Sequence, residues 1–386
     1  MALLDGVTVL DLASVGPAAR ASRWLADYGA RVVKVSPPPG RAGTQIVPPY
    51  YAYGGHRGME RVNIDLKADA GRAAFLRLAA TADVVIESFR PGAADKLGIG
   101  YEAVRAGNPG IIYCSTTGYG QEGPKAQWAG HDLNYLAVAG YLDCSGRTAE
   151  AGPALPGATV ADSAAGGLHA VAAVLAALVG RAASGEGMHL DVSVTDGVVA
   201  LMSLAIDEHL ATGVVPGPGH NILTGRYACY DVYPCADGRW VAVGAIEPRF
   251  FANLCRALGC EDLAGRQLDD DAQAELRAAL RAAFGTRPRD EWVEILAPAD
   301  CCVSPVATVA EVVADEHFRA RDVIVTAERP GHDPLEQVGF VLAGMDRDQA
   351  MPVVRDPLST DTDALLGAAG YDAAALAALR EQGTVA

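Results

Sequence analysis

The chain has 386 residues, of which 50% are hydrophobic and 20% are charged, so it can bury a sizeable core and is long enough for about two domains. Its 47 acidic residues outnumber its 31 lysines and arginines and give a formal charge of −16. Because such a charge repels nucleic-acid phosphates and anionic lipid surfaces, we expect neither nucleic acid nor a membrane as a partner.

The first third of the chain alternates short apolar runs with helical periods. We expect strands at 7–12, 32–35, 83–87 and 110–115, and helices at 17–30, 75–82 and 93–106. This alternation indicates parallel βαβ units with right-handed crossovers. The predicted fold class is therefore α/β, with a Rossmann-like parallel sheet that is covered on both faces and has its sites at the strand carboxyl ends.

A long Ala/Leu/Val helix is expected at 162–183, followed by a strand at 190–194. The Gly- and Pro-rich stretch 213–225 marks a connector, beyond which a second unit begins. This unit is expected to contain a hairpin at 227–243 with its turn at 235–238, and helices at 248–259, 272–284, 289–296 and 309–315. An amphipathic helical pair at 360–381 ends the chain.

The remaining composition features exclude further classes of protein. The longest strongly apolar stretch, residues 168–179, is shorter than the ~20 residues of a membrane span, so no transmembrane helix is expected. The first residues carry no basic region or cleavage site of a signal peptide, which favours a cytoplasmic location. The eight cysteines form no CxxC pair and no zinc-like Cys/His cluster, so we expect no metal.

The string Gly118–Gly123 matches the GxGxxG pattern of dinucleotide-binding loops. The residues after it do not form the apolar face of a phosphate-binding helix, and no acidic residue ends a strand at the appropriate distance. We interpret the string as a tight-turn loop near a ligand rather than as a nicotinamide site.

Polar residues at three predicted helix starts are candidates for chemistry. His131 and Asp132 open an apolar helical stretch after a glycine, and Asp162 opens the long helix. Glu247 stands directly before a proline that suits a first helical turn. Each of these residues could be a helix cap, a catalytic group or both, and the dipole at a helix N-terminus favours the charged form of a carboxylate there.

Arg90 follows a predicted strand. It could receive a phosphate or be an ordinary surface arginine.

Several short strings occur in a fixed order along nearly the whole chain. They are Leu4–Leu12, Leu25–Val32, Ile64–Lys67, Glu87–Gly92, Gly118–Gln121, Gly130–Tyr135, Ala245–Pro248 and 360–371. Together they resemble the family of alpha-methylacyl-CoA racemases and family III CoA-transferases.

The resemblance implies an enzyme that acts on acyl-CoA, and it favours the racemase branch. That branch carries a His-Asp pair after glycine, an Asp that opens the long helix and a Glu before proline, which correspond to His131-Asp132, Asp162 and Glu247. The transferase branch uses the matching Asp as a nucleophile that forms an aspartyl-CoA thioester, and it typically lacks the His and the Glu. The alternatives are therefore a CoA-transferase with Asp162 as nucleophile and a catalytically idle acyl-CoA-binding protein.

The chemistry of a 2-methylacyl-CoA racemase explains this set of residues. A weakly acidic proton beside the thioester carbonyl must leave one face of the carbon, and a proton must return to the other face. His131 and Asp162 could act as the two acid–base groups, with Glu247 orienting the imidazole. Backbone N–H groups at the start of the Asp162 helix are the expected donors to the enolate oxygen. No metal or redox cofactor is needed, since CoA is part of the substrate.

The resemblance also predicts a path for the CoA moiety. The residues expected to line it are Ile64, Asp65, Leu66, Lys67, Arg90, Gly130, Asn134 and Tyr135. Two positions depart from the family pattern, because Pro37 stands where an Arg is common and Ala158 where racemases tend to have Asn. The segment 44–61 is also longer than expected for a racemase and could reshape the acyl pocket.

The family fold implies a particular domain arrangement. The large Rossmann-like domain is expected at 1–190, a linker at 191–225 and a smaller α+β domain at 226–318. The chain then returns to the large domain and its C-terminal helices at 319–386. The resemblance further implies an interlocked homodimer with the active site between domains of two chains.

Overall fold

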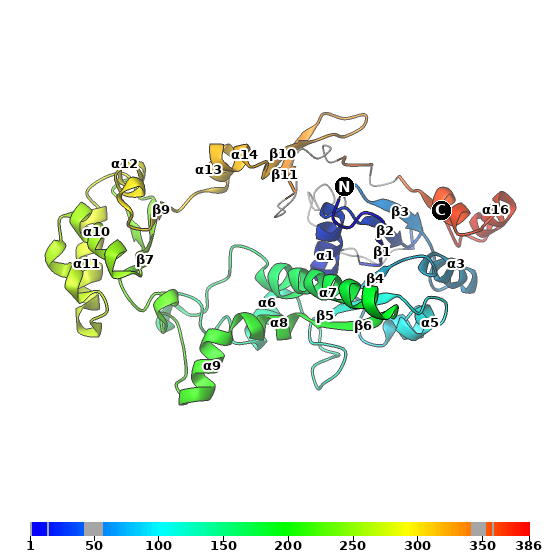
Figure 1. Ribbon diagram of the computed structural model, residues 1–386, viewed down its shortest axis with the longest axis horizontal. Coiled ribbons are helices and arrows are strands. Elements are labelled where there is room, and N and C mark those ends of the chain that lie inside the picture. Colours follow the sequence, from blue (N-terminus) through cyan, green and yellow to red (C-terminus); the bar gives the residue numbers. More distant parts are fainter. Residues whose placement is uncertain (1, 14, 42–56, 341–352, 357–358) are drawn as a thin grey trace. The chain divides into compact units, whose positions relative to one another are not determined.

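The computed structural model describes residues 2–13, 15–41, 57–340, 353–356 and 359–386 (Figure 1). The chain divides into two compact units. The first comprises Met1–Ala139, Pro156–Met202 and Glu316–Ala386, and the second comprises Gly140–Leu155 and Ser203–Asp315. The long segment at 44–61, in which a reshaped acyl pocket was expected, lies largely outside the described residues.

The first unit is built on a six-stranded parallel sheet with the strand order β3-β2-β1-β4-β5-β6. Its strands are β1 Thr8–Asp11, β2 Arg31–Ser36, β3 Glu60–Asn63, β4 Val84–Glu87, β5 Ile112–Thr117 and β6 Met188–Ser193. The predicted α/β class with a parallel sheet is therefore confirmed. The sequence did not reveal β3, because its four residues include only one hydrophobic side chain.

Alternate residues of the four inner strands, β2, β1, β4 and β5, enter two different cores, as the period of a β-strand requires. In β1, Val9 belongs to one core and Leu10 to the other. The core around Val9 is closed by α1 (Gly16–Asp27) and α7 (His169–Ser184). The core around Leu10 is closed by α3 (Asp69–Ala79), α5 (Tyr101–Arg105), α15 (Thr362–Ala368) and α16 (Ala373–Glu381). Both faces of the sheet are thus covered (Figure 1).

The C-terminal segment completes the edge of this sheet. Val385 forms an antiparallel bridge with Ile64, and the N–H of Asp65 donates to the carbonyl of Thr384 at 2.8 Å. The remaining elements of the first unit are α4 (Ala93–Lys96), α6 (Asp132–Val138), α8 (Val194–Leu201), α14 (Glu316–Ala320), β10 (Ile324–Ala327) and β11 (Leu335–Val338). The last residues of the chain therefore hold the 64–67 segment in place.

The long helix predicted at 162–183 begins as a π-helix. Residues Ala161–Leu168 are π-helical, and α7 continues from them as a regular α-helix. A Cβ added at Gly166 would lie 2.5 Å from Cβ of Pro17, and one added at Gly167 would lie 2.8 Å from the Trp24 ring. The glycine pair therefore allows α1 to pack directly on the π-helical segment.

The whole Ala161–Ser184 helix has 24 residues and is long and apolar enough to cross a bilayer by length and composition. The sequence argument from length is therefore wrong, since it considered only residues 168–179. In the structure, the inward residues Ala170, Val171 and Val174 pack in the core on the sheet. The burial is partial, since 39% of the most apolar 18-residue window of this helix is buried.

The second unit contains a three-stranded antiparallel sheet with helices against one face. The predicted hairpin is formed by β7 (Tyr230–Pro234) and β8 (Trp240–Gly244), and β9 (Val303–Pro305) pairs with β8. Its helices are α9 (Ser203–Thr212), α10 (Pro248–Leu258), α11 (Gln273–Phe284), α12 (Arg289–Leu296) and α13 (Val309–Ala314). Phe251, Phe284 and Trp292 fill the core between these helices and the sheet.

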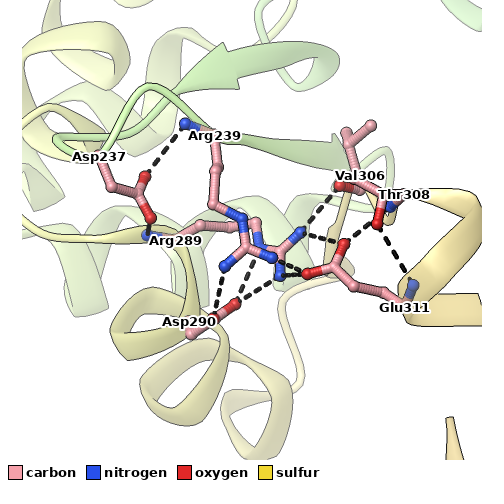
Figure 2. A network of polar contacts seen from close by, with 7 residues as sticks. All are labelled: Asp237, Arg239, Arg289, Asp290, Val306, Thr308 and Glu311. Carbon is pink, nitrogen blue, oxygen red and sulfur yellow. Dashed lines mark hydrogen bonds and ion pairs between the residues drawn. The ribbon is translucent and has the colours of Figure 1, made fainter. Parts of the chain in front are cut away.

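A polar network at the end of the second unit joins α12 to α13 (Figure 2). The guanidinium of Arg289, which is 5% exposed, donates to both carboxylate oxygens of Glu311 at 2.6 and 3.1 Å and to the carbonyl of Val306 at 2.9 Å. Thr308 caps α13 by accepting a hydrogen bond from the Glu311 N–H. The network thereby holds α13, the last helix of the second unit, against α12.

Replacing Gly166 by alanine should destabilise the first unit by about 1–3 kcal/mol, because the added methyl group overpacks the Pro17 ring. Gly180 in α7 is the matched control, since a Cβ there meets nothing within 4 Å. Gly180→Ala should stabilise the helix by about 0.5–1 kcal/mol. Chemical denaturation of both variants measures the difference, and equal stabilities would contradict the close packing of α1.

Candidate active site

The strand order places a topological switch point between β1 and β4, where open α/β sheets bind their ligands. A cavity of about 440 Å³ lies there, at the carboxyl ends of the strands. Its lining residues are Leu12, Val35, Ser36, Pro37, Arg41, Ile64, Asp65, Leu66, Lys67, Phe89 and Leu97. The structure thus brings together four of the residues predicted to bind CoA, from Ile64 to Lys67.

Arg41 supplies a cation to this cavity four residues beyond Pro37. Its guanidinium forms an ion pair with the Asp65 carboxylate, and Lys67 lines the same cavity. The cavity therefore contains an arginine, Arg41, although Pro37 occupies the position at which the family often has one. Two cations and one carboxylate give its rim a net positive charge, in a chain that is acidic overall.

A buried ion pair holds the chain where β1 ends beside this cavity. The Lys34 ammonium lies 2.7 Å from Oδ2 of Asp11, and the two side chains are 4% and 0% exposed. The other carboxylate oxygen of Asp11 accepts the Ala13 N–H at 2.7 Å, and Lys34 also donates to the Ala13 carbonyl. Because every partner is buried and hydrogen-bonded, removal of either charge should be strongly destabilising.

Asp162 and Asp132 lie together at the start of the π-helical segment. Oδ1 of Asp132 accepts a hydrogen bond from the Asp162 N–H at 2.8 Å. The Ser163 N–H donates to the carbonyl of Thr159 at 3.0 Å. These two N–H groups are therefore occupied in this arrangement, and the expectation that N–H groups at this helix start stabilise an enolate stays a prediction.

His131 precedes α6 and has its side chain exposed. Oδ1 of Asn134 accepts the His131 N–H at 3.0 Å, which caps the helix. The Tyr135 hydroxyl donates to the Gly130 carbonyl at 2.5 Å. The segment from Gly130 to Tyr135 is thus ordered by its own side chains, and the His131 side chain is exposed.

Charges of both signs act on Asp162. Burial raises the pKa of its carboxyl group above the ordinary value, Arg20 lowers this pKa, Asp132 raises it and His131 lowers it. Burial, reinforced by the charge of Asp162, raises the pKa of Tyr135 to about 12. Of the three charged neighbours that act on the pKa of Asp162, Arg20 has the largest effect and His131 the smallest.

Sequence reasoning missed Arg20. Its Nη1 lies 3.3 Å from Oδ2 of Asp162, and its Nη2 donates to Oγ1 of Thr159 at 2.9 Å. The only sequence signal was an arginine within the alanine-rich first turns of a helix. An interaction that spans 142 residues of sequence cannot be found from local pattern.

The GxGxxG string forms a loop and no helix follows it directly, as expected for a tight turn. Gly120 and Gly123 have φ angles of 84° and 93°. A Cβ at Gly118 would lie 2.3 Å from the Tyr135 ring, and one at Gly130 would lie 2.7 Å from it. The first glycine of the string therefore makes room for an aromatic side chain rather than for a phosphate.

Arg90 lines a different, smaller cavity of about 170 Å³. In this cavity Oγ of Ser115 lies 3.0 Å from Nε2 of His189, and burial raises the pKa of Glu87. The structure thus does not place Arg90 in the cavity that Ile64–Lys67 line. Its assignment to the CoA path stays a prediction.

Glu247 belongs to the second unit, where it precedes α10 and is exposed. Its predicted action on the His131 imidazole therefore stays a prediction. Within the described ranges, no group of three or more His, Cys, Asp or Glu side chains is arranged to hold a metal ion.

Comparison with known proteins finds relatives of this chain over most of its length. Residues 4–359 match the model of CoA-transferase family III. The chain is 36% identical to the alpha-methylacyl-CoA racemase of Homo sapiens over 86% of this chain and 85% of that protein. It is 31% identical to the acetyl-CoA:oxalate CoA-transferase of Acetobacter aceti over 88% and 94% of the two chains.

A solved structure shows the same fold. The protein Rv3272 of M. tuberculosis, in its orthorhombic crystal form, superposes with a TM-score of 0.79 at 29% identity. The match covers 94% of this chain and 98% of that chain.

Proposed function

The chain belongs to CoA-transferase family III, whose members act on acyl-CoA, and within this family we propose that it is a racemase of 2-methyl-branched acyl-CoA thioesters. The observation that carries the proposal is the hydrogen bond at 2.8 Å from the Asp162 N–H to Oδ1 of Asp132, which brings the residue directly after His131 against Asp162. A transferase needs only the carboxylate as nucleophile, whereas inversion of a carbon needs a second acid–base group. The similarity to the human racemase supports the same reading.

In the proposed reaction, one group removes the α-proton and the other returns a proton to the opposite face. When the Asp162 carboxylate takes the proton, the electrons of the C–H bond form the enolate with the thioester carbonyl. The His131 imidazolium then delivers its proton to the α-carbon, and the carbonyl is restored. In the reverse direction the two groups exchange roles, so each acts as base toward one enantiomer.

The nucleotide end of CoA is proposed to occupy the cavity at the switch point. Lys67 and Arg41 line it with positive charge, and a CoA molecule carries its phosphates at this end. The apolar residues Leu12 and Phe89 offer a surface for an adenine ring. The cavity volume of about 440 Å³ is within the range of small-ligand pockets.

Incubation with (R)- and with (S)-2-methylacyl-CoA in D₂O tests the racemase proposal. The wild type should epimerise both enantiomers and incorporate deuterium at the α-carbon. His131→Ala and Asp162→Ala should each lower exchange by at least about 10²-fold, each toward a different enantiomer. His332→Ala, an exposed histidine elsewhere in the first unit, is the control and should exchange normally.

Two results would contradict the racemase proposal. Absence of exchange, together with an Asp162–CoA thioester that hydroxylamine or borohydride traps, would identify a transferase. Absence of both reactions, with acyl-CoA still bound, would identify a binding protein.

Lys67→Ala should raise KM for acyl-CoA by about tenfold or more and leave kcat nearly unchanged, since a charged hydrogen bond contributes about 1.5–3 kcal/mol. Added salt should reduce the difference between variant and wild type. Arg380→Gln, which removes an exposed cation from α16, is the control. Equal KM values in the Lys67 and Arg380 variants would exclude this cavity as the phosphate site.

We also propose that the chain forms a homodimer. In the first unit, Leu168, Val179 and Leu201 are 51%, 74% and 53% exposed, and in the second unit Leu204 and Leu210 of α9 are 51% and 76% exposed. Exposed leucine and valine side chains in such numbers mark surfaces that another protein covers. Sedimentation should give twice the chain mass, and a monomer at micromolar concentration would contradict the proposal.

A further inference from the structure

Helix α1 presents one row of side chains to the π-helical segment Ala161–Leu168. Pro17, Arg20 and Trp24 follow one another at helical spacing, and each lies against the glycine pair: Pro17 against Gly166, and Arg20 and Trp24 against Gly167. A Cβ at Gly167 would lie only 3.2 Å from Cβ of Arg20. The same Cβ would lie 3.0 Å from the carbonyl oxygen of Asp162, so Arg20 is held one π-helical turn beyond Asp162 along the segment.

From this position the guanidinium contacts two groups. Nη1 lies 3.3 Å from Oδ2 of Asp162, and Nη2 donates to Oγ1 of Thr159 at 2.9 Å. The Arg20 and Asp162 side chains are 23% and 17% exposed, so solvent reaches the pair only in part. Thr159 anchors the second arm of the guanidinium and thereby restricts the orientation of the first.

The other charged and titratable groups that act on Asp162 come from one helix. These groups are His131 and Asp132 at the start of α6 and Tyr135 within it. Asp132 opposes the charge of Asp162, whereas His131 favours it. Arg20 contributes the largest effect that opposes burial, and an arginine keeps its charge at every working pH.

We propose that Arg20 is a positioning residue that keeps Asp162 ionised and in one orientation, so that its carboxylate is ready to act as base toward the enantiomer that it deprotonates. The inference deepens the proposed function and rests on it. Arg20 touches none of the reacting atoms in this scheme. It acts through Asp162. After the product leaves, Asp162 releases to solvent the proton that it took from the α-carbon, and His131 takes up a proton from solvent to replace the one that it delivered.

Arg20→Met keeps the aliphatic stem on Gly167 and removes the charge. For the enantiomer that Asp162 deprotonates, the acidic limb of the kcat/KM profile should move to higher pH by about one unit or more, because a neighbouring Arg lowers a carboxyl pKa by about 1–3. Arg20→Lys should move it back toward the wild-type position. Arg31→Met is the control. It removes an exposed guanidinium from β2, where Arg31 pairs with Glu60 of β3, and should leave the acidic limb unchanged.

Thr159→Val separates orientation from charge, since it removes the anchoring hydroxyl and leaves the ion pair. It should lower kcat severalfold with little displacement of the acidic limb. An unchanged limb in Arg20→Met, with epimerisation intact, would overturn the inference and leave the proposed function standing.

A second measurement does not depend on activity. In protein labelled with ¹³C at the aspartate carboxyl carbon, the Asp162 resonance is identified by its loss in Asp162→Asn and is then titrated. In Arg20→Met the midpoint should rise by about one pH unit or more. The same midpoint in both proteins would refute the role of Arg20, even if the wild type proved to be a transferase.

Discussion

The candidate site depends on the close approach of helix α1 to the π-helical start of the long helix. Side chains larger than hydrogen at Gly166 and Gly167 would force these two elements apart. With the glycines in place, Arg20 reaches Asp162, although the two residues come from distant parts of the chain. A π-helical turn shifts the register of the backbone within a helix, and such turns frequently occur at functional sites. The chemistry proposed for Asp162 thus follows from a packing contact.

The parallel sheet provides the second constraint. The direction of its strand order reverses between β1 and β4. The cavity lined by Ile64–Lys67 lies at the carboxyl ends of β1 to β4. The buried pair of Lys34 and Asp11 holds the end of β1, and the C-terminal Val385 holds the 64–67 segment from the other side. The cavity is therefore positioned by contacts of Asp11 with Lys34 near the N-terminus and of Ile64 with Val385 at the C-terminus.

The sequence allowed the sheet and most helices to be predicted, because strands such as β4 are continuous apolar runs between clear turn signals. It did not allow β3 to be predicted, since Glu60–Asn63 owes its pairing to β2 and to the C-terminal segment rather than to its own composition. His131, Asp132 and Asp162 could be identified from their places at helix starts and from the family resemblance.

The partners of these residues could not be predicted. The Arg20 contact depends on tertiary packing, and the carboxylate of Asp132 occupies a backbone donor that the sequence left free for an enolate. The role of Gly118 likewise became clear only when the Tyr135 ring was found against it.

The central claim is that two different groups serve the two faces of one carbon. It is tested most directly by following a single enantiomer of 2-methylacyl-CoA in D₂O at early times, with the isotope content of substrate and product measured separately. Two bases predict product that carries solvent deuterium from its first appearance, while the remaining substrate is still largely protiated. Product that retains the substrate's own proton, or a substrate pool that exchanges without any epimer forming, would contradict the account.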